Sequence, residues 1–271
     1  MRRAIVFGVP RSGTSWLGAM LGSHPRVQYR FQPIHSYTFP PSLRKDSPLD
    51  DIERFFSALR VSDDPFIHRQ SMADEQGTRA SEDSRSATHL IFKEVHDFWA
   101  IVNCVRLDDS ISLIGLVRDP VYVLNSWIHT PAEWSSNWRV EEEWYAAKRK
   151  NGEYSGNYFG VKAWLETTHA LVRLREQHPE QVMIARYHEL KADPRKVLQG
   201  VFKKLGLHLV QEIEEFIEQS LRGYDPNPYS VFRGESAGGS GFAVPKDIAK
   251  EIYTLAKRNG LEDFLESKQT F

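Results

Sequence analysis

The chain of 271 residues has a single cysteine, Cys104, and therefore cannot form an intrachain disulfide. Cys104 lies in the apolar stretch FWAIVNCV, where we expect a buried, unreactive thiol. No run approaches the roughly 18 consecutive apolar residues of a membrane span. The N-terminus, MRRAIVFGVP, is too short before its proline and arginine for a signal peptide. These absences predict a cytoplasmic protein with no membrane partner.

The chain also lacks an excess of charge of either sign. Lysine and arginine number 35, aspartate and glutamate 36, and the formal net charge is -1. A nearly neutral chain does not attract polyanions in general, which argues against a nucleic-acid partner. An anion site therefore has to be built locally. The hydrophobic fraction of 41% and the charged fraction of 26% are ordinary for a soluble globular protein.

Short apolar runs alternate with helical patterns, which is typical of an α/β protein with a parallel sheet. The apolar runs predict strands at 4–8, 27–31, 89–94, 111–117 and 182–187. Amphipathic patterns predict helices at 15–23, 51–59, 98–105, 121–128, 158–177, 194–205 and 245–259, and polar composition predicts a surface loop at 71–88. Because no repeat or linker divides the chain, we expect one domain over residues 1–271 with a central parallel sheet flanked by helices.

A glycine-containing loop joins the first predicted strand to the first predicted helix. Residues 8–15 read GVPRSGTS, the spacing of the phosphate loop GxxxxGK[ST], with Thr14 in place of the lysine. Backbone amides and the helix N-terminus can surround an anion there, and Arg11 adds a cation. The missing lysine normally reaches the β- and γ-phosphates. The sequence therefore predicts a fold of the phosphate-loop type whose anion is not a terminal triphosphate.

A second anion site is predicted where the strand at 111–117 ends. The segment LIGLVRDPVYVLNSW at 113–127 places Arg118 at the strand end and Ser126 about two helical turns later. Both side chains reach one tetrahedral anion if the loop bends back across the strand tip. The guanidinium supplies charge and directed donors, and the hydroxyl adds a neutral donor. Taken alone this pair indicates little, because a solvated arginine at a strand end is common.

Together the two loops resemble those of the sulfotransferases that use 3′-phosphoadenosine 5′-phosphosulfate (PAPS) as the sulfuryl donor. The run PRSGTSWL at 10–17 is similar to the 5′-phosphosulfate-binding loop of that family. The resemblance implies donor binding by a set of consecutive loop residues, Arg11, Ser12, Gly13, Thr14, Ser15 and Trp16. It also implies that Arg118 and Ser126 bind the 3′-phosphate. Adenosine 3′,5′-bisphosphate (PAP) is then the product, and no metal is implied.

Two weaker stretches extend the resemblance. The stretch at 185–207 is similar to a late strand and helix of the family whose tyrosine lies near the nucleotide, which makes Tyr187 a candidate contact. PYSVFRGES at 228–236 partly resembles a C-terminal Arg-Lys-Gly loop that closes over the 3′-phosphate. Arg233 and Gly234 match that loop, whereas its lysine and a tryptophan that often follows are missing. We expect Arg233 and Gly234 to contact the donor.

Sulfuryl transfer needs cations that stabilise charge on the sulfuryl group and a base that takes the acceptor's proton. Arg11 is the first candidate cation, and Lys93 is the second, since relatives carry a lysine near the end of this strand. One branch of the family has Phe-x-Glu-Pro after its second strand, where this chain reads FQPIH. Gln32 stands in the glutamate position and cannot accept a proton. The nearby His35 is a candidate replacement.

Another branch of the family has Lys-Thr-His at the end of a middle strand, where this chain reads KEVH. Here Lys93 aligns, and Glu94 and His96 flank the position of the family's histidine. In a continued strand these two share a face, and a partly desolvated carboxylate gains a raised pKa that suits a base. Glu94 could equally be an ion-pair partner of Lys93. The order of preference for the base is Glu94, His96, His35.

The acceptor is open. Aromatic residues crowd one stretch of the chain, namely Trp127, Trp134, Trp138, Trp144, Tyr145 and Tyr154. Such residues suit a carbohydrate or another small molecule by stacking, and they equally suit core packing. Two other functions stay open: a phosphate-loop kinase, for which Asp119 is the available metal-binding carboxylate, and a nucleotide-binding protein without a base. A homodimer is also left open.

Overall fold

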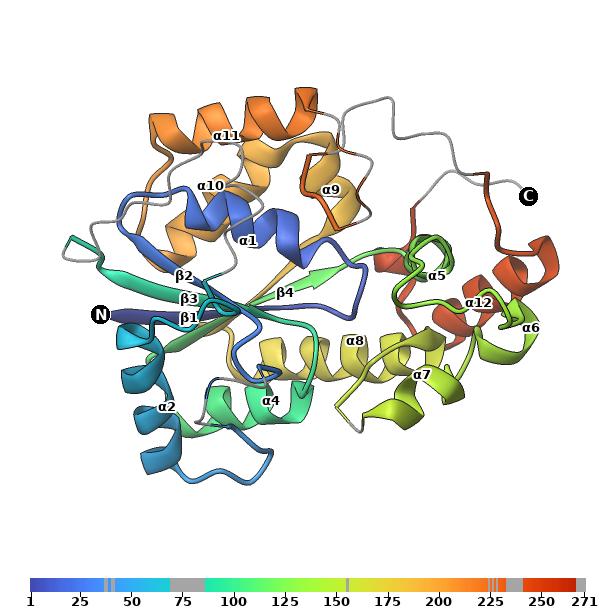
Figure 1. Ribbon diagram of the computed structural model, residues 1–271, viewed down its shortest axis with the longest axis horizontal. Helices are drawn as coiled ribbons and strands as arrows, with labels where there is room; N and C mark the ends of the chain where they lie inside the picture. Colours follow the sequence, from blue (N-terminus) through green and yellow to red (C-terminus); the bar gives the residue numbers. More distant parts are fainter. Residues whose placement is uncertain are drawn as a thin grey trace.

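The computed structural model describes residues 1–36, 39, 42–68, 86–154, 156–223, 225, 227, 229–232 and 241–266. A five-stranded sheet lies at its centre (Figure 1), formed by β1 (Arg2–Phe7), β2 (Val27–Phe31), β3 (His89–Glu94), β4 (Ile111–Val117) and β5 (Val182–Arg186). The strand order is β2-β3-β1-β4-β5, and every neighbouring pair is parallel. The predicted α/β fold with a central parallel sheet is confirmed.

Helices cover both faces of the sheet (Figure 1). One face carries α1 (Thr14–Gly22), α9 (Tyr187–Ala192), α10 (Pro194–Leu205) and α11 (Gln211–Arg222). The other face carries α2 (Leu49–Val61), α4 (Phe98–Leu107) and α8 (Gly160–Gln177). Beyond the end of the sheet lie α5 (Pro120–Ile128), α6 (Val140–Glu143), α7 (Lys148–Glu153), α12 (Lys246–Arg258) and a final 3₁₀ turn, Glu262–Phe264. None of the helices within these ranges has the length and apolar character that a bilayer crossing requires.

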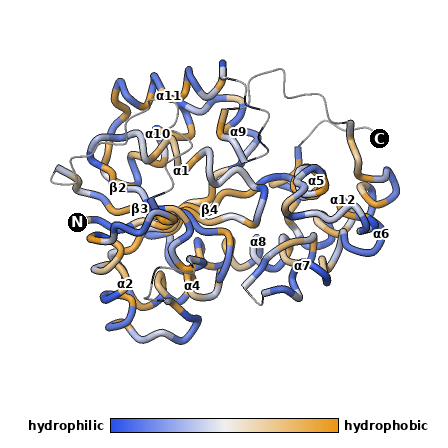
Figure 2. The backbone as a smooth tube through the Cα atoms, viewed as in Figure 1, coloured by the Kyte–Doolittle hydropathy of each residue, from blue (hydrophilic) through white to orange (hydrophobic). Residues whose placement is uncertain are grey.

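The sheet separates two apolar cores, because successive strand residues point to opposite faces. In β1, Ile5 and Phe7 pack into the core with α2, α4 and α8, whereas Ala4 and Val6 pack against α1 and α10. Figure 2 shows the apolar residues concentrated where the strands cross the middle of the molecule. Burial on both faces gives β1 and β4 long apolar runs, which explains why the sequence predicted these strands within two residues. Cys104 is buried, as predicted.

The helices were less fully predicted than the strands. α10 has the predicted bounds, and the other predicted helices differ by a few residues at their ends. The structure adds α11 and the short helices α6, α7 and α9, which the sequence interpretation left out. The pattern of α11 was visible, since Ile213, Phe216, Ile217 and Ser220 are buried at helical spacing. The predicted loop at 71–88 lies outside the described residues up to position 85.

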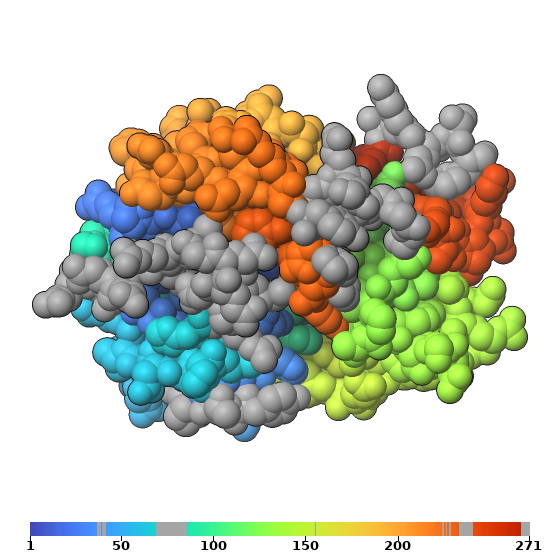
Figure 3. Space-filling model, turned by 45° about the horizontal axis from the view of Figure 1, so that its top comes forward, coloured from blue at the N-terminus to red at the C-terminus, as the bar shows by residue number. Residues whose placement is uncertain are grey.

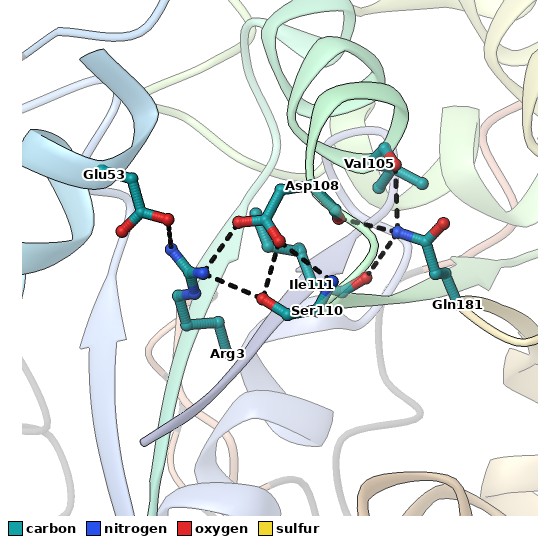
Figure 4. A network of polar contacts seen from close by, with 7 residues as sticks. All are labelled: Arg3, Glu53, Val105, Asp108, Ser110, Ile111 and Gln181. Carbon is teal, nitrogen blue, oxygen red and sulfur yellow. Dashed lines mark hydrogen bonds and ion pairs between the residues drawn. The ribbon is translucent and has the colours of Figure 1, made fainter. Parts of the chain in front are cut away.

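A polar network holds the amino-terminal end of the sheet (Figure 4). Arg3 of β1 pairs with Glu53 of α2 at 3.0 Å and with Asp108 after α4 at 2.8 Å. The amide nitrogen of Gln181, just before β5, donates to three backbone carbonyls within 105–111 at 2.9 to 3.1 Å. These contacts join strands and helices at one edge of the sheet. At the opposite end of the sheet, where the strands finish, loops follow each strand.

Candidate active site

A cavity of about 540 Å³ opens at the carboxyl ends of the strands. Its wall includes Arg11 after β1, Gln32 after β2, Val95 after β3, Arg118 after β4 and Tyr187 after β5. All five strands therefore deliver residues to one place. Open α/β sheets bind ligands in this position, and the volume suits a small-molecule site.

The loop between β1 and α1 has the backbone shape of an anion site. Arg11 and Gly13 adopt left-handed conformations, with φ of 72° and 92°. Such turns direct successive backbone amides toward a common point, and α1 begins immediately afterwards at Thr14. Gly13 has no room for a side chain, because a Cβ there would overlap the ring of Tyr187. The predicted strand, anion loop and helix are thus present in the structure.

Five of the six predicted loop residues line the cavity, namely Arg11, Gly13, Thr14, Ser15 and Trp16. Ser12 is the exception. It is fully buried, lies off the cavity wall, and its amide donates to the carbonyl of Val9 at 3.1 Å. Its hydroxyl has no hydrogen-bond partner among the described residues. The Ser12 side chain is therefore turned away from the cavity, and binding of the donor by Ser12 stays a prediction.

Arg118 and Ser126 both line the cavity, so the loop after β4 bends back across the strand tip. Arg118 Nη1 donates to the carbonyl of Arg11 at 3.1 Å, and its guanidinium lies 4.5 Å from the centre of the Tyr187 ring. Arg11 Nε in turn donates to Ser126 Oγ at 3.3 Å. The two predicted anion sites are therefore neighbours in one cavity.

The Nε of Arg118 is buried and has no hydrogen-bond partner within the described ranges. A buried donor left without a partner costs about 1–3 kcal/mol. An anionic oxygen bound beside Arg118 supplies the missing acceptor. The second site is therefore chemically suited to a phosphate.

Lys93, one residue before the end of β3, lies on the cavity wall, although only 3% of the residue is exposed. Its Nζ lies 4.2 Å from the centre of the Phe31 ring, a cation-π contact that partly replaces lost hydration. Burial lowers the pKa of Lys93 to about 8. Its role as the second cation of the transfer stays a prediction.

Glu94 is fully buried and lies off the cavity wall. Its Oε2 accepts hydrogen bonds from the amides of Ile34 and His35 at 3.2 and 3.3 Å. Its Oε1 accepts from the amides of Val95 and His96 at 2.9 and 3.2 Å. Burial raises the pKa of Glu94 to about 7. Because β3 ends at Glu94, strand alternation stops there, and the prediction that Glu94 and His96 share one face is wrong.

His35 and His96 line the cavity and stack on each other, with ring centres 3.9 Å apart and planes 25° apart. Burial lowers the pKa of both imidazoles, that of His96 to about 3. Tyr154 lies 5.2 Å from the His35 ring and donates to Asp97 at 2.7 Å. The stack is a polar wall next to the loop after β2, and His96 in this environment holds a proton only weakly.

Residues 4–212 match the family model described as "Sulfotransferase family". The chain belongs to the sulfotransferase family. Mouse carbohydrate sulfotransferase 1 is 23% identical over 300 residues, which cover 86% of this chain and 71% of that protein. The carbohydrate sulfotransferase 1 of Danio rerio is 28% identical over 155 residues, or 54% of this chain and 35% of that protein.

Solved sulfotransferases share the fold. The sulfotransferase from Alicyclobacillus acidocaldarius superposes with a TM-score of 0.54 at 14% identity, covering 100% of this chain and 98% of that one. Mouse sulfotransferase SULT7A1, complexed with PAP, superposes with a TM-score of 0.55 at 16% identity, covering 98% and 90%. The phosphate-loop fold inferred from the first loop is therefore a sulfotransferase fold.

This sulfotransferase also has cavity residues that no sequence motif indicated. Glu133, in the connection after α5, lines the cavity with its Oε1 3.7 Å from Arg11 Nη1. Lys150 and Glu153 of α7 line it as well and pair with each other at 2.7 Å. Glu133, Lys150 and Glu153 lie between α5 and α8, in a stretch that matches no motif. Only the fold brings these residues next to the ends of the strands.

Most of the aromatic cluster of the sulfotransferase belongs to its core. Trp127 and Trp134 are buried, with ring centres 4.7 Å apart in an edge-to-face arrangement. Trp138 and Trp144 pack against the same core. Of the six aromatic residues singled out in the sequence, Tyr154 lines the cavity. The structure therefore favours core packing over acceptor stacking for the tryptophans.

Arg233 and Gly234 lie outside the described residues, so their predicted contact with the donor stays a prediction. The segment just before them does reach the site, since Tyr229, Ser230 and Val231 line the cavity. The Tyr229 ring centre lies 5.5 Å from the Arg11 guanidinium. Figure 3 shows this orange segment lying beside the green residues that follow β4.

Asp119 does not provide the metal-binding carboxylate that a phosphate-loop kinase needs. It is fully buried, off the cavity wall, and accepts from the amides of Val121 and Glu266 at 2.9 and 3.0 Å. Across the described ranges, no group of three His, Cys, Asp or Glu residues is arranged to hold a metal ion. The kinase alternative has no support in the geometry.

Proposed function

We propose that this sulfotransferase moves the sulfuryl group of PAPS to a hydroxyl or amine of a carbohydrate or another small molecule. The observation that carries the proposal is that two anion sites, at the ends of β1 and β4, open into one cavity. A nucleotide with separate 5′ and 3′ anionic groups can occupy both sites at once. The similar fold of the mouse enzyme complexed with PAP and the similarity to carbohydrate sulfotransferase 1 support this assignment.

In this proposal the loop after β1 holds the 5′-phosphosulfate through Arg11, its backbone amides and the N-terminus of α1. Arg118 and Ser126 hold the 3′-phosphate, which gives the buried Nε of Arg118 its acceptor. Tyr187 contacts the nucleotide from the end of β5. No metal is required, because side-chain cations and amides balance the donor's charge.

The transfer is an in-line displacement at sulfur. The acceptor oxygen or nitrogen attacks the sulfur, and the bond from sulfur to the bridging oxygen breaks, so that PAP leaves with the electron pair. Arg11 and Lys93 stabilise the charge that develops on the bridging and sulfuryl oxygens. Glu94 has no access to the acceptor in this arrangement, whereas His35 and His96 do.

The acceptor occupies the side of the cavity away from the phosphate loop. Its wall combines the imidazoles of His35 and His96 with Tyr154, Lys150 and Glu153. Rings next to hydrogen-bonding groups suit a hydroxylated ring such as a sugar. A cytoplasmic location and a homodimer stay predictions from the sequence.

The test is transfer of radiolabelled sulfuryl from PAPS to a panel of neutral oligosaccharides, phenols and amines, with EDTA present. We expect label in at least one acceptor class, with one PAP released per transfer. The Arg11→Ala variant should turn over about 100-fold more slowly or worse, because an electrostatic contact to the reacting group is lost. No labelled acceptor, together with phosphoryl transfer from ATP and Mg²⁺, would contradict the proposal.

A further inference from the structure

Glu133 lines the cavity next to the loop that we propose holds the donor. It contacts Arg11 of the donor loop, with 3.7 Å between Oε1 and Nη1, and 20% of its side chain is exposed. Lys93 from β3 and Lys150 from α7 also act on its charge. Three cations from three separate elements thus line the same cavity as this carboxylate and favour its charge. The sulfuryl group has to pass this point, since it leaves a donor held by Arg11.

The second carboxylate oxygen of Glu133, Oε2, accepts no hydrogen bond from the described residues. This oxygen is also buried. A buried carboxylate oxygen without a donor is unfavourable, so the site gains from a ligand that supplies one. An acceptor hydroxyl or amine is such a donor, and it needs this contact for its proton to be removed.

We propose that Glu133 is the general base of the transfer, which rests on the proposed function. Oε2 accepts a hydrogen bond from the acceptor and takes its proton as the new bond to sulfur forms. The bond between sulfur and the bridging oxygen breaks in the same step, and its electron pair leaves with PAP. The proton on Glu133 passes to solvent before the next turnover.

The other candidate bases are less well placed. Glu94 is enclosed by four amides, and Glu153 is paired with Lys150 on an exposed part of α7, with 54% of its side chain exposed. The groups that face Glu133 are Arg11, Lys93, Lys150 and Tyr229. Burial raises the pKa of Glu133, and the three cations offset part of that rise. A bound anionic donor neutralises Arg11 and so makes Glu133 a stronger base.

The experiment compares Glu133→Gln with the wild-type enzyme. Glutamine keeps the shape and an oxygen for Arg11 and removes the proton acceptor. Release of PAP from PAPS is measured under single-turnover conditions, with the best acceptor of the panel and with water. We expect a rate reduced by about 10²–10⁴-fold. PAP affinity by calorimetry should be unchanged or higher, since a negative charge beside Arg11 is gone.

Two controls separate catalysis from folding and from general charge. Glu141→Gln removes a carboxylate of α6 that lies off the cavity wall, with 55% of its side chain exposed, and this variant should stay within about 3-fold of the wild-type rate, because an exposed ion pair contributes little. Glu133→Asp keeps a base and should recover part of the lost rate. The wild-type rate should rise with pH through the ionisation of Glu133, and this rise should be missing in Glu133→Gln.

Three outcomes would overturn the assignment of the base. They are a near-normal rate in Glu133→Gln, an unchanged pH profile in that variant, or a loss of rate matched by an equal loss of PAP affinity and a lower Tm. A pH dependence that disappears in His35→Asn or His96→Asn instead would move the role to that histidine. If the wild-type enzyme neither binds PAP nor transfers label, the proposed function fails, not the assignment of Glu133.

Discussion

Glu94 is a buried carboxylate whose hydrogen bonds all go to backbone amides in the described part of the chain. Its two oxygens accept hydrogen bonds from four backbone amides, two in the loop after β2 and two in the turn after β3. Those same segments carry His35 and His96, whose rings stack at 3.9 Å. The carboxylate therefore sets the spacing of the two imidazoles on the cavity wall without touching the cavity itself.

The Glu94→Gln variant is expected to be less stable than the wild type. Glutamine offers one acceptor oxygen and turns an NH₂ group toward two amides that donate, which leaves buried donors unpaired. The free energy of unfolding should fall by about 1–3 kcal/mol, the penalty for a buried polar group without a partner. Urea denaturation measures this. Wild-type stability combined with lost turnover would instead return Glu94 to the role of base.

The two anion sites were predictable because each rests on one short segment. Arg11 belongs to a loop whose spacing carries the geometry, and Arg118 follows a strand in which Ser112 is the one polar residue. Glu133 was not predictable, because its partners come from the β1–α1 loop, β3 and α7. The burial of Glu94 could not be foreseen either, since it depends on where β3 stops.

Among the helices, α5 connects the second anion site to the C-terminal part of the chain. Asp119 caps its first turn through the amide of Val121 and holds the amide of Glu266 with its other oxygen. Asn125 accepts a hydrogen bond from the amide of Ala243 at 2.8 Å. Ser126 follows directly on the same helix. The position of Ser126 therefore depends on segments more than a hundred residues away.

Replacement of Asp119 tests this connection. Asp119→Ala removes both the helix cap and the contact to Glu266, and should lower the free energy of unfolding by about 1–3 kcal/mol. Asp119→Asn retains a good capping residue and should lose less. PAP affinity should fall in the same order, because Arg118 precedes the cap and Ser126 lies on the helix that Asp119 caps. Equal stability and equal affinity in the two variants would contradict the role assigned to Asp119.

The strands and the helices differed in how well the sequence predicted them. A strand buried on both faces is a continuous apolar run with polar ends, and its bounds follow directly from the residues. α11 mixes charged and apolar residues and lies in a stretch where no motif drew attention. Trp16 of α1 donates to Ser220 of α11 at 3.0 Å, so the overlooked helix supports the donor loop.

For the whole molecule, the central feature is that β1 and β4 are adjacent in the sheet. Adjacent parallel strands end side by side, so the loops that follow them form one cavity with two anion sites. Figure 1 shows α1 leaving the end of β1 on one side and α5 leaving the end of β4 beyond the sheet. A ligand with two anionic groups, one for each loop, suits this arrangement.

The most direct test of this account is the energetic coupling between Arg118 and the 3′-phosphate. Calorimetry without Mg²⁺ gives the affinities of PAP and of adenosine 5′-monophosphate for the wild type and for Arg118→Ala. In the wild type, removal of the 3′-phosphate should weaken binding about 30-fold or more, as expected for a lost buried charge-assisted contact. In Arg118→Ala the two nucleotides should bind with nearly equal affinity, because residues in contact are not additive. If removal of the 3′-phosphate weakens binding equally in the wild type and in Arg118→Ala, the 3′-phosphate does not bind at Arg118, and the account is contradicted.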